Sequence, residues 1–270
     1  MRIVSLLPSA TDIVVALGAQ EELVGVSHSC GSQWSGLPRL TSTRIDVTSA
    51  SSAIDTQVKT SNEPLYDLDI EMLERLSPDV IVSQSLYDVC AVPSGDVEKA
   101  VAQLSSRPHL VNLSPFRLAD IPDGIEDVGA AINRCETASS VVANWNETLL
   151  GLRRQTTSSH KVAFLDWLEP PFAAGHWIPD LIEVIGYESA LARPGEPSYE
   201  ISWNDVRAAE PDIVIAACCG FTAARASQDE APADLDIHIL NGYEYFSRPG
   251  PNLLQSAQIL AKLVEQELAR

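Results

Sequence analysis

The chain has 270 residues, of which 45% are apolar, and its mean hydropathy is close to zero at +0.02. This length and balance fit a folded protein of two ordinary domains and exclude a disordered chain. The net charge of −19, with 37 acidic against 18 basic residues, disfavours a phosphate backbone as partner, so we expect no nucleic-acid role. The acidic excess also favours a halophilic source, because concentrated salt screens charge repulsion.

The start of the chain and its cysteines bear on localisation. A strand is predicted from residue 2 or 3, without a preceding basic segment, long apolar stretch and small-residue cleavage site. No apolar run approaches the about 20 residues that span a bilayer. Five cysteines, an odd number, fit reduced thiols better than a disulfide framework. As written, the chain is expected to be cytoplasmic, and to be a monomer.

The predicted elements of the first half alternate between strand and helix. Strands are predicted near residues 2–7, 23–27, 79–83 and 109–113. The first strand leads into the segment Pro8-Ser9-Ala10-Thr11 and then into a helix that ends at Gly18. Residues 41–62 are rich in Ser, Thr and Ala and lack periodicity. We interpret that segment as a surface excursion that carries little functional weight.

Residues 121–157 change to a helical pattern. Ile125, Val128 and Ile132 share one face, and a second helix follows Cys135. The second lobe begins with a strand at 161–165, continues with a helix over 179–185 that ends before Gly186, and finishes with an amphipathic helix over 252–269. The long helical segment is predicted to be a stiff connection between two α/β lobes.

A short internal repeat supports this division. Residues 77–82 read Ser-Pro-Asp-Val-Ile-Val and residues 210–215 read Glu-Pro-Asp-Ile-Val-Ile, each after an amphipathic stretch. A helix that stops before a proline and leads into a buried β-branched run is half of a parallel α/β unit. The predicted fold is therefore α/β, with two Rossmann-like lobes at 1–115 and 160–270 and a linking helical segment at 116–159.

The residues that follow the strands are the candidate site, because ligands of open α/β sheets bind outside the carboxyl ends of the strands. Aromatic side chains there favour a large, flat and partly apolar ligand. The candidates from the first half are Pro8, Ser9, Ala10, Thr11, His28, Cys30, Gln84, Tyr87 and Cys90. Those from the second half are Trp167, Phe172, His176, Trp177, Cys219, Phe221, Tyr245 and Phe246.

Several of these residues have a packing alternative. Trp167 and Trp177 could close the core over the sheet, and Cys218 could be a buried thiol that packs as a small apolar side chain. His28, Cys30, Cys90 and His176 could instead hold an iron or zinc ion, as in a metal-ion receptor or metallochaperone. A thiol-dependent enzyme that uses Cys90 is a further alternative, although no catalytic motif is present.

Five segments resemble the substrate-binding proteins of cobalamin and iron-chelate ABC transporters, the two-lobed class with a helical backbone, and especially their vitamin B12-binding members. The segments are Pro8-Ser9-Ala10-Thr11-Asp12, Val24-Gly25-Val26-Ser27, residues 76–82, Pro170-Pro171-Phe172-Ala173-Ala174-Gly175, and residues 245–251 with the sequence Tyr-Phe-Ser-Arg-Pro-Gly-Pro. They run in order along nearly the whole chain. The resemblance implies a class III periplasmic-binding-protein fold and a position at the cell surface or in the periplasm.

What the resemblance implies for function is a non-catalytic protein that holds cobalamin, or a similar corrinoid or metal chelate, between its lobes. No cofactor is expected beyond this ligand, and an ABC permease is the implied partner. Trp167, Phe172, Trp177, Phe221 and Tyr245 would form apolar walls. Residues 8–11 would offer amides and hydroxyls at a helix N-terminus, and His176 or Cys90 could approach an axial metal position.

Overall fold

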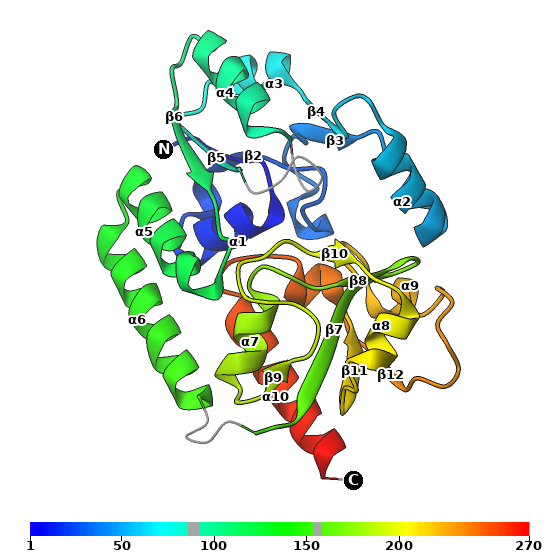
Figure 1. Cartoon of the computed structure of the whole chain (residues 1–270). Helices are drawn as coiled ribbons and strands as arrows, with labels where there is room; N and C mark the ends of the chain where they lie inside the picture. Colours follow the sequence, from blue (N-terminus) through cyan, green and yellow to red (C-terminus); the bar gives the residue numbers. More distant parts are fainter. Residues whose placement is uncertain (86–91, 154–157, 270) are drawn as a thin grey trace. The chain divides into compact units, whose positions relative to one another are not determined.

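The computed structural model describes residues 1–85, 92–153 and 158–269 of the chain, which forms two compact units. The first unit contains residues 1–48, 56–114 and 120–143, and the second contains 49–55, 115–119 and 144–270. Figure 1 shows the elements of both units along the chain. The chain thus changes unit several times, and the domain boundaries taken from the sequence stay a prediction.

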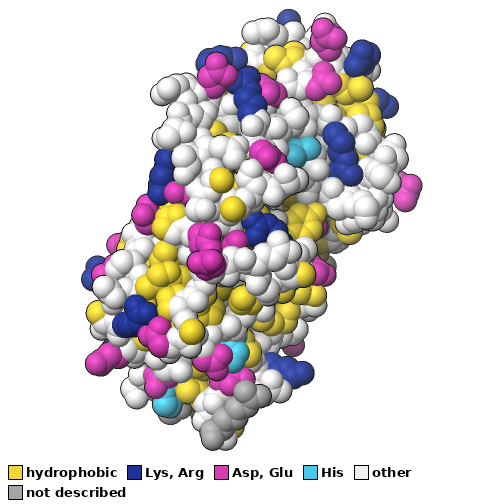
Figure 2. Space-filling model, turned by 90° about the vertical axis from the view of Figure 1, so that its right-hand side faces the viewer, with side chains coloured by type: hydrophobic (Ala, Val, Ile, Leu, Met, Phe, Trp, Pro, Cys, Tyr) yellow, Lys and Arg dark blue, Asp and Glu magenta, His cyan; other side chains and the backbone are white. Residues whose placement is uncertain are grey.

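Figure 2 shows the distribution of charged side chains on one face of the molecule. On the face shown in Figure 2, acidic and basic side chains are intermingled, and no basic stripe is seen there. Among the helices of the described residues, none has the length and apolar character needed to cross a membrane.

The first unit is built on a parallel sheet in the order β2-β1-β5-β6. Its strands are β1 (Ile3–Ser5), β2 (Leu23–Val26), β5 (Val80–Gln84) and β6 (His109–Leu113). The associated helices are α1 (Pro8–Ala16), α3 (Ile70–Leu76), α4 (Ser94–Gln103) and α5 (Ile121–Ala131), with the short 3₁₀ turns η1 (Gln20–Glu22) and η2 (Ser32–Trp34). The 3₁₀ turn η3 (Leu118–Asp120) begins in the second unit and ends in the first. The predicted α/β class with parallel strands is confirmed.

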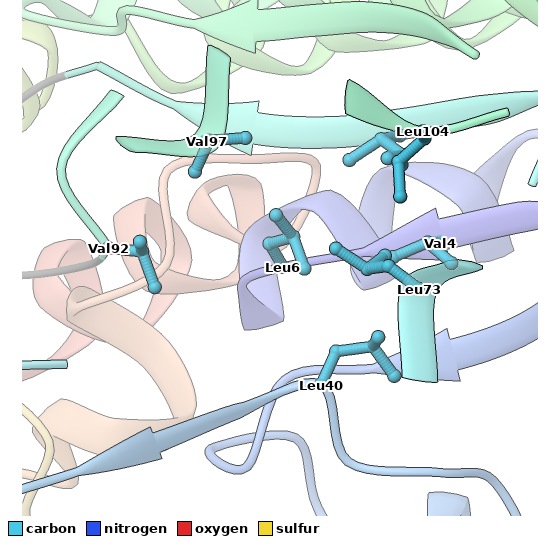
Figure 3. Packing of buried hydrophobic residues seen from close by; sticks show 8 residues of the cluster. Val4, Leu6, Leu40, Leu73, Val92, Val97 and Leu104 are labelled. Carbon is cyan, nitrogen blue, oxygen red and sulfur yellow. The ribbon is translucent and has the colours of Figure 1, made fainter. Parts of the chain in front are cut away.

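The core of this unit lies between the sheet and its helices. Val4 and Leu6 project from β1 and its end toward Leu73 of α3 and Val97 of α4, as Figure 3 shows. All four side chains are buried. Burial of such side chains stabilises the fold by about 1.5–3 kcal/mol each, which explains why short strands suffice here.

Residues 41–62 lie mostly at the surface, as their interpretation as a surface excursion expects, but they contain regular secondary structure that the sequence pattern did not indicate. β3 (Thr41–Thr43) pairs antiparallel with β4 (Tyr66–Leu68), and α2 (Ser51–Thr60) lies between them in sequence. Only Ser51 and Ile54 of α2 are buried, so the apolar periodicity that would have announced a helix is nearly absent. The sequence pattern therefore does not predict α2, which is identified only in the structure.

The second unit has a mixed sheet around a long central strand, β7 (Lys161–Leu168). β11 (Ile213–Ala216) and β12 (Ile237–Ile239) continue the sheet in parallel on one side, and β9 (Glu188–Ser189) pairs parallel with β7. β8 (Pro171–Ala173) turns back antiparallel on β7 and pairs with β10 (Tyr199–Glu200). The helices are α7 (Ile178–Val184), α8 (Trp203–Ala208), α9 (Ala223–Ala226), α10 (Leu253–Leu268) and the π-helical turn η4 (Gly242–Phe246).

The predicted second helix of the linking segment is α6 (Cys135–Leu152). Gly129 of α5 lies so close to Ala138 of α6 that an added Cβ would come within 2.5 Å of the Ala138 Cβ, and the two helices run side by side in Figure 1. Trp145 of α6 is 1% exposed and belongs to the second unit. α6 therefore begins in one unit and ends in the other.

The repeated Pro-Asp segments perform the same structural task in both units. The Asp79 carboxylate accepts a hydrogen bond from the backbone N–H of Arg2 at 2.7 Å, and the Asp212 carboxylate accepts one from Lys161 at 2.7 Å. The backbone N–H of Asp79 donates to the Arg2 carbonyl, and that of Asp212 donates to the Lys161 carbonyl, each at 2.9 Å. Each aspartate thus joins the start of one strand to the start of its parallel neighbour.

This arrangement predicts that Asp79→Ala and Asp212→Ala each destabilise the protein. Loss of a charged acceptor on a strand-initiating N–H should lower the free energy of unfolding by about 1 kcal/mol or more. Asp127→Ala, on the exposed face of α5, is the matched control and should change it by less than about 0.5 kcal/mol. Urea unfolding measures all three; equal stability of the Asp79, Asp212 and Asp127 variants would contradict the structural role.

Candidate functional site

The first candidate loop of unit one is the start of α1, which begins at Pro8 after Leu7. Thr11 is 1% exposed, and its hydroxyl lies 2.8 Å from Ser5 Oγ and 3.2 Å from Cys30 Sγ. Ser9 and Ala10 are likewise buried, whereas Pro8 is partly exposed. The Thr11 hydroxyl and the Cys30 thiol therefore satisfy each other inside the unit, which favours a packing role for both.

His28 follows β2 and is held by hydroxyl groups. Its Nδ1 lies 2.7 Å from Thr41 Oγ1, its Nε2 lies 3.1 Å from Ser29 Oγ, and its ring is 5.8 Å from that of Tyr66. Burial, and secondarily the charge of Arg39, lowers the pKa of His28. A neutral imidazole with hydrogen bonds at both nitrogens is an oriented polar group, and it has little freedom to ligate an ion.

The remaining candidates of the first half lie at the end of β5. Gln84 is 6% exposed and is the last residue of that strand, opposite Leu113 of β6. Ser85 follows it, and the Ser85 hydroxyl lies 2.6 Å from that of Ser114. Tyr87 and Cys90 lie outside the described residues, so their roles stay predictions.

The second unit brings two aromatic candidates together. Trp167, near the end of β7, and Phe221, after β11, have ring centroids 4.7 Å apart at 40°. The guanidinium carbon of Arg225 lies 4.4 Å from the Phe221 ring centroid. Trp167 is partly exposed and stands opposite Phe172 of β8 in the strand register. We call Trp167, Phe172 and Phe221 the aromatic wall of the second unit.

Trp177 and Phe246 form a different cluster, inside the unit. Trp177 is 7% exposed, and its indole N–H donates to the Phe246 carbonyl at 3.1 Å. Phe246 is 3% exposed, and its ring lies 5.2 Å from that of Phe164 on β7. Both rings complete the core beneath the carboxyl ends of the strands, so the packing alternative fits Trp177 better than a ligand wall does.

His176 and its loop are fixed by the backbone. The His176 N–H donates to the Glu196 carbonyl at 2.7 Å, and the Gly195 N–H donates to the His176 carbonyl at 3.0 Å. His176 has a left-handed φ of 55°, and its half-buried ring stacks on Trp177 at 5.6 Å. Gly175 allows the close approach, because a Cβ there would meet the Pro197 carbonyl carbon at 2.6 Å. Burial lowers the pKa of His176.

Asp166 ties this loop to the sheet, a role that sequence reasoning missed. Ser198 Oγ donates to the Asp166 carboxylate at 2.5 Å and accepts a bond of 3.0 Å from the Gly175 N–H. Burial raises the pKa of Asp166 to about 7, although the Ser198 hydrogen bond opposes part of that rise. Burial thus favours the protonated form of this carboxyl group over a wider pH range than in an exposed aspartate. Ser198 is 32 positions from Asp166 in the sequence, so no local motif predicts that the two residues interact.

The two adjacent cysteines after β11 differ in exposure. Cys218 is buried and Cys219 is exposed, and the Cys219 N–H donates to the Asp166 carbonyl at 2.8 Å. Burial raises the pKa of Cys218 to about 12. Cys218 is therefore a protonated core thiol at neutral pH, as the packing alternative expects.

Tyr245 lies in η4 with a second tyrosine, Tyr243. The guanidinium carbon of Arg248 is 4.3 Å from the ring centroid of Tyr243, and the Tyr243 N–H donates to the Phe221 carbonyl at 2.8 Å. The Tyr245 carbonyl accepts a hydrogen bond from the Ser256 hydroxyl of α10. Both tyrosines are partly exposed, so this turn offers rings beside the aromatic wall's Phe221.

Metal ligands do not gather in the part of the chain that the structure describes. There, no three His, Cys, Asp or Glu side chains are grouped as they would be around an ion. A hollow of the second unit, near the start of β7 and β9, is lined by Ser158, Glu183, Tyr187, Glu188 and Arg193 among others. None of these residues is a candidate from the sequence.

Comparison with known proteins defines the class of protein. A model of the periplasmic binding protein family matches residues 3–236, so the chain belongs to that family. The vitamin B12-binding protein of Vibrio cholerae is 24% identical over 267 residues, covering 95% of this chain and 86% of the relative. That of Pectobacterium atrosepticum is 24% identical over 281 residues, covering 99% and 90%.

Solved structures show the same fold. The crystal structure of the periplasmic vitamin B12 binding protein of Vibrio cholerae superposes with a TM-score of 0.73 at 20% identity, covering 100% of this chain and 98% of the other. The periplasmic heme-binding protein of Roseiflexus sp. RS-1 gives 0.72 at 21% identity, with 98% of each chain covered. The resemblance seen in the sequence and the class III periplasmic-binding-protein fold are confirmed.

The raised pKa of Asp166 predicts a pH-dependent stability difference for Asp166→Asn. A carboxyl group whose pKa is higher in the folded state stabilises the fold below its unfolded pKa, and this contribution is lost as the pH rises toward about 7. Asp166→Asn should therefore gain stability relative to the parent chain between pH 4 and pH 8, by an amount on the order of 4 kcal/mol. Urea unfolding at a series of pH values measures the difference.

Asp212→Asn is the control of opposite sign. The Lys161 backbone N–H is the main cause that lowers the Asp212 pKa, so that carboxylate stabilises the fold at neutral pH and this contribution is lost on acidification. The stability deficit of Asp212→Asn should shrink as the pH falls. A difference between Asp166→Asn and the parent chain that stays constant from pH 4 to pH 8 would show that Asp166 is not protonated by the fold.

Proposed function

We propose that this protein is the non-catalytic ligand-binding component of an ABC-type uptake system, and that it carries cobalamin or a similar metal chelate to a membrane permease. The relatives named above as vitamin B12-binding proteins support this assignment, since they match the chain over nearly its full length. The periplasmic location in the names of the related structures favours action outside the cytoplasm over the cytoplasmic placement expected from the sequence.

The observation that carries the proposal is the aromatic wall at the carboxyl ends of β7 and β11. Trp167 and Phe221 are in ring contact at 4.7 Å, and Phe172 is the strand neighbour of Trp167. Trp167 and Phe172 keep part of their rings exposed, whereas Phe221 is 8% exposed and packs against Trp167. The exposed parts of the Trp167 and Phe172 rings give an apolar surface, which suits the flat face of a macrocycle. The partly exposed Tyr243 and Tyr245 add polar rims to it.

Haem is the second candidate ligand, because it presents a similar flat, metal-centred face, and heme-binding proteins are among the structures with this fold. A receptor for a bare iron or zinc ion receives no support from the described residues, where three or more candidate ligands do not gather. The thiol-enzyme alternative rests on Cys90, which lies outside the described residues.

Titration calorimetry with cyanocobalamin tests the proposal, with haem titrated in parallel by absorbance. We expect saturable one-to-one binding of cyanocobalamin by the parent chain. Trp167→Ala should weaken it about tenfold or more, because a large apolar contact is lost.

Trp203→Ala is the matched control, because Trp203 is also partly exposed but starts α8 rather than lying near the carboxyl end of a strand. It should leave the affinity within about twofold of the parent value. Absence of heat with cyanocobalamin together with tight haem binding would move the assignment to haem. Absence of binding to both would remove the proposal.

A further inference from the structure

Arg225 of α9 makes contacts that its own helix does not explain. Its Nη1 donates to the Asp229 carboxylate at 2.9 Å, and its Nη2 donates to the Ser49 carbonyl at 2.9 Å and lies 3.3 Å from Ser51 Oγ. Ser51 Oγ in turn donates to the other oxygen of Asp229 at 2.6 Å. These contacts close a ring, which we call the Arg225 clamp: Ser49, Ser51, Arg225 and Asp229.

The clamp is largely withdrawn from solvent. The Asp229 side chain is 4% exposed, that of Arg225 is 23% exposed, and Ser51 is fully buried. A buried ion pair loses hydration that its mutual attraction only partly restores, so stability alone is a weak reason for such a pair. Fixed geometry is the better-supported consequence, because a planar guanidinium with several occupied donors has one orientation.

That orientation matters because the guanidinium lies over an aromatic ring. Arg225 Cζ is 4.4 Å from the centroid of Phe221, and Phe221 in turn contacts Trp167 at 4.7 Å. The segment that contains Asp229 is also hydrogen-bonded to Glu169, which in turn contacts Trp167 of the aromatic wall. The Glu230 N–H, next to Asp229, donates to the Glu169 carboxylate, and the Trp167 indole N–H donates to the Glu169 carbonyl at 3.0 Å.

We propose that Arg225 is a positioning residue for ligand binding, which sets the rings of Phe221 and Trp167 through the clamp that Ser49 and Ser51 complete. The proposal rests on the proposed function in one respect, that the aromatic wall contacts the ligand. It assigns a role to residues 49–51, a segment whose sequence predicts little functional weight. Residues 49–55 belong to the second unit, although the chain on both sides of them belongs to the first.

The first arm of the test uses the ligand-free protein. Near-ultraviolet circular dichroism of the parent chain minus that of Trp167→Phe isolates the signal of the Trp167 ring. The same difference is then measured with Arg225→Met in both members of the pair. We expect the Trp167 signal to lose most of its amplitude, because a flexible thioether side chain cannot hold the Phe221 ring at one angle.

Arg207→Met is the matched control. Arg207 forms a bidentate pair with Asp234 at 2.8 and 2.9 Å in the same unit, but both side chains are exposed. The Trp167 signal should keep its full amplitude in this variant. Ser51→Ala, a milder change that leaves the Arg225–Asp229 pair in place, should reduce the signal in part, and far-ultraviolet dichroism checks that each variant is folded.

The second arm measures cyanocobalamin affinity in the same variants. Arg225→Met should weaken binding about tenfold and Ser51→Ala about threefold, whereas Arg207→Met should leave it unchanged. An unchanged Trp167 signal in Arg225→Met would overturn the positioning role. If Arg225→Met loses the Trp167 signal but binds cyanocobalamin as tightly as the parent chain, the proposed effect of Arg225 on ligand binding is wrong. If the parent chain binds no cyanocobalamin, the proposed function fails, and the dichroism arm still decides whether Arg225 orients the wall.

Discussion

Two aspartate carboxylates fix the strand register on which the rest of each unit depends. Asp79 holds the backbone N–H of Arg2, and Asp212 holds that of Lys161, each at 2.7 Å. The strands then run in step from these starts, with Ile3 opposite Val80 in one unit and Val162 opposite Ile213 in the other. Because parallel neighbours start level and run in the same direction, the loops that follow them lie toward one edge of the sheet.

The repeated segments made this arrangement readable from sequence. Each combines a helix end, a proline and a β-branched run, and the residues before the prolines, Ser77 and Glu210, both have left-handed φ angles that end the preceding helix. Gly18 and Gly186 end the first helix of each unit in the same conformation, with φ of 69° and 86°. Local chemistry determines these features, so a local pattern predicts them.

Other features of the fold depend on distant partners, and sequence reasoning missed them. α2 has few apolar side chains, and its first turn is buried through Ser51, whose partner Asp229 is 178 positions away. The same limit applied to the candidate site. Trp167 was found because it follows the predicted strand at 161–165, which in the structure extends to Leu168, and Phe221 because it follows β11. The roles of Arg225 and Ser198 depend on contacts that no short window of sequence contains.

The chemistry of the candidate residues follows from their burial. Thr11 and Cys30 are occupied with each other, Trp177 completes the core, and His28 is neutral between two hydroxyl groups. The rings that keep exposed surface lie on Trp167, Phe172 and the tyrosines of η4. An edge lined by partly exposed rings suits a flat chelate better than a bare ion.

Hydrogen exchange of the whole chain with and without cyanocobalamin tests most directly whether the carboxyl ends of the strands bind the ligand. Our account predicts slower exchange in peptides that cover 166–177, 219–222 and 242–248. It predicts no change in those that cover 77–80 and 210–212, at the opposite ends of the strands. Protection confined to the amino ends of the strands would contradict it.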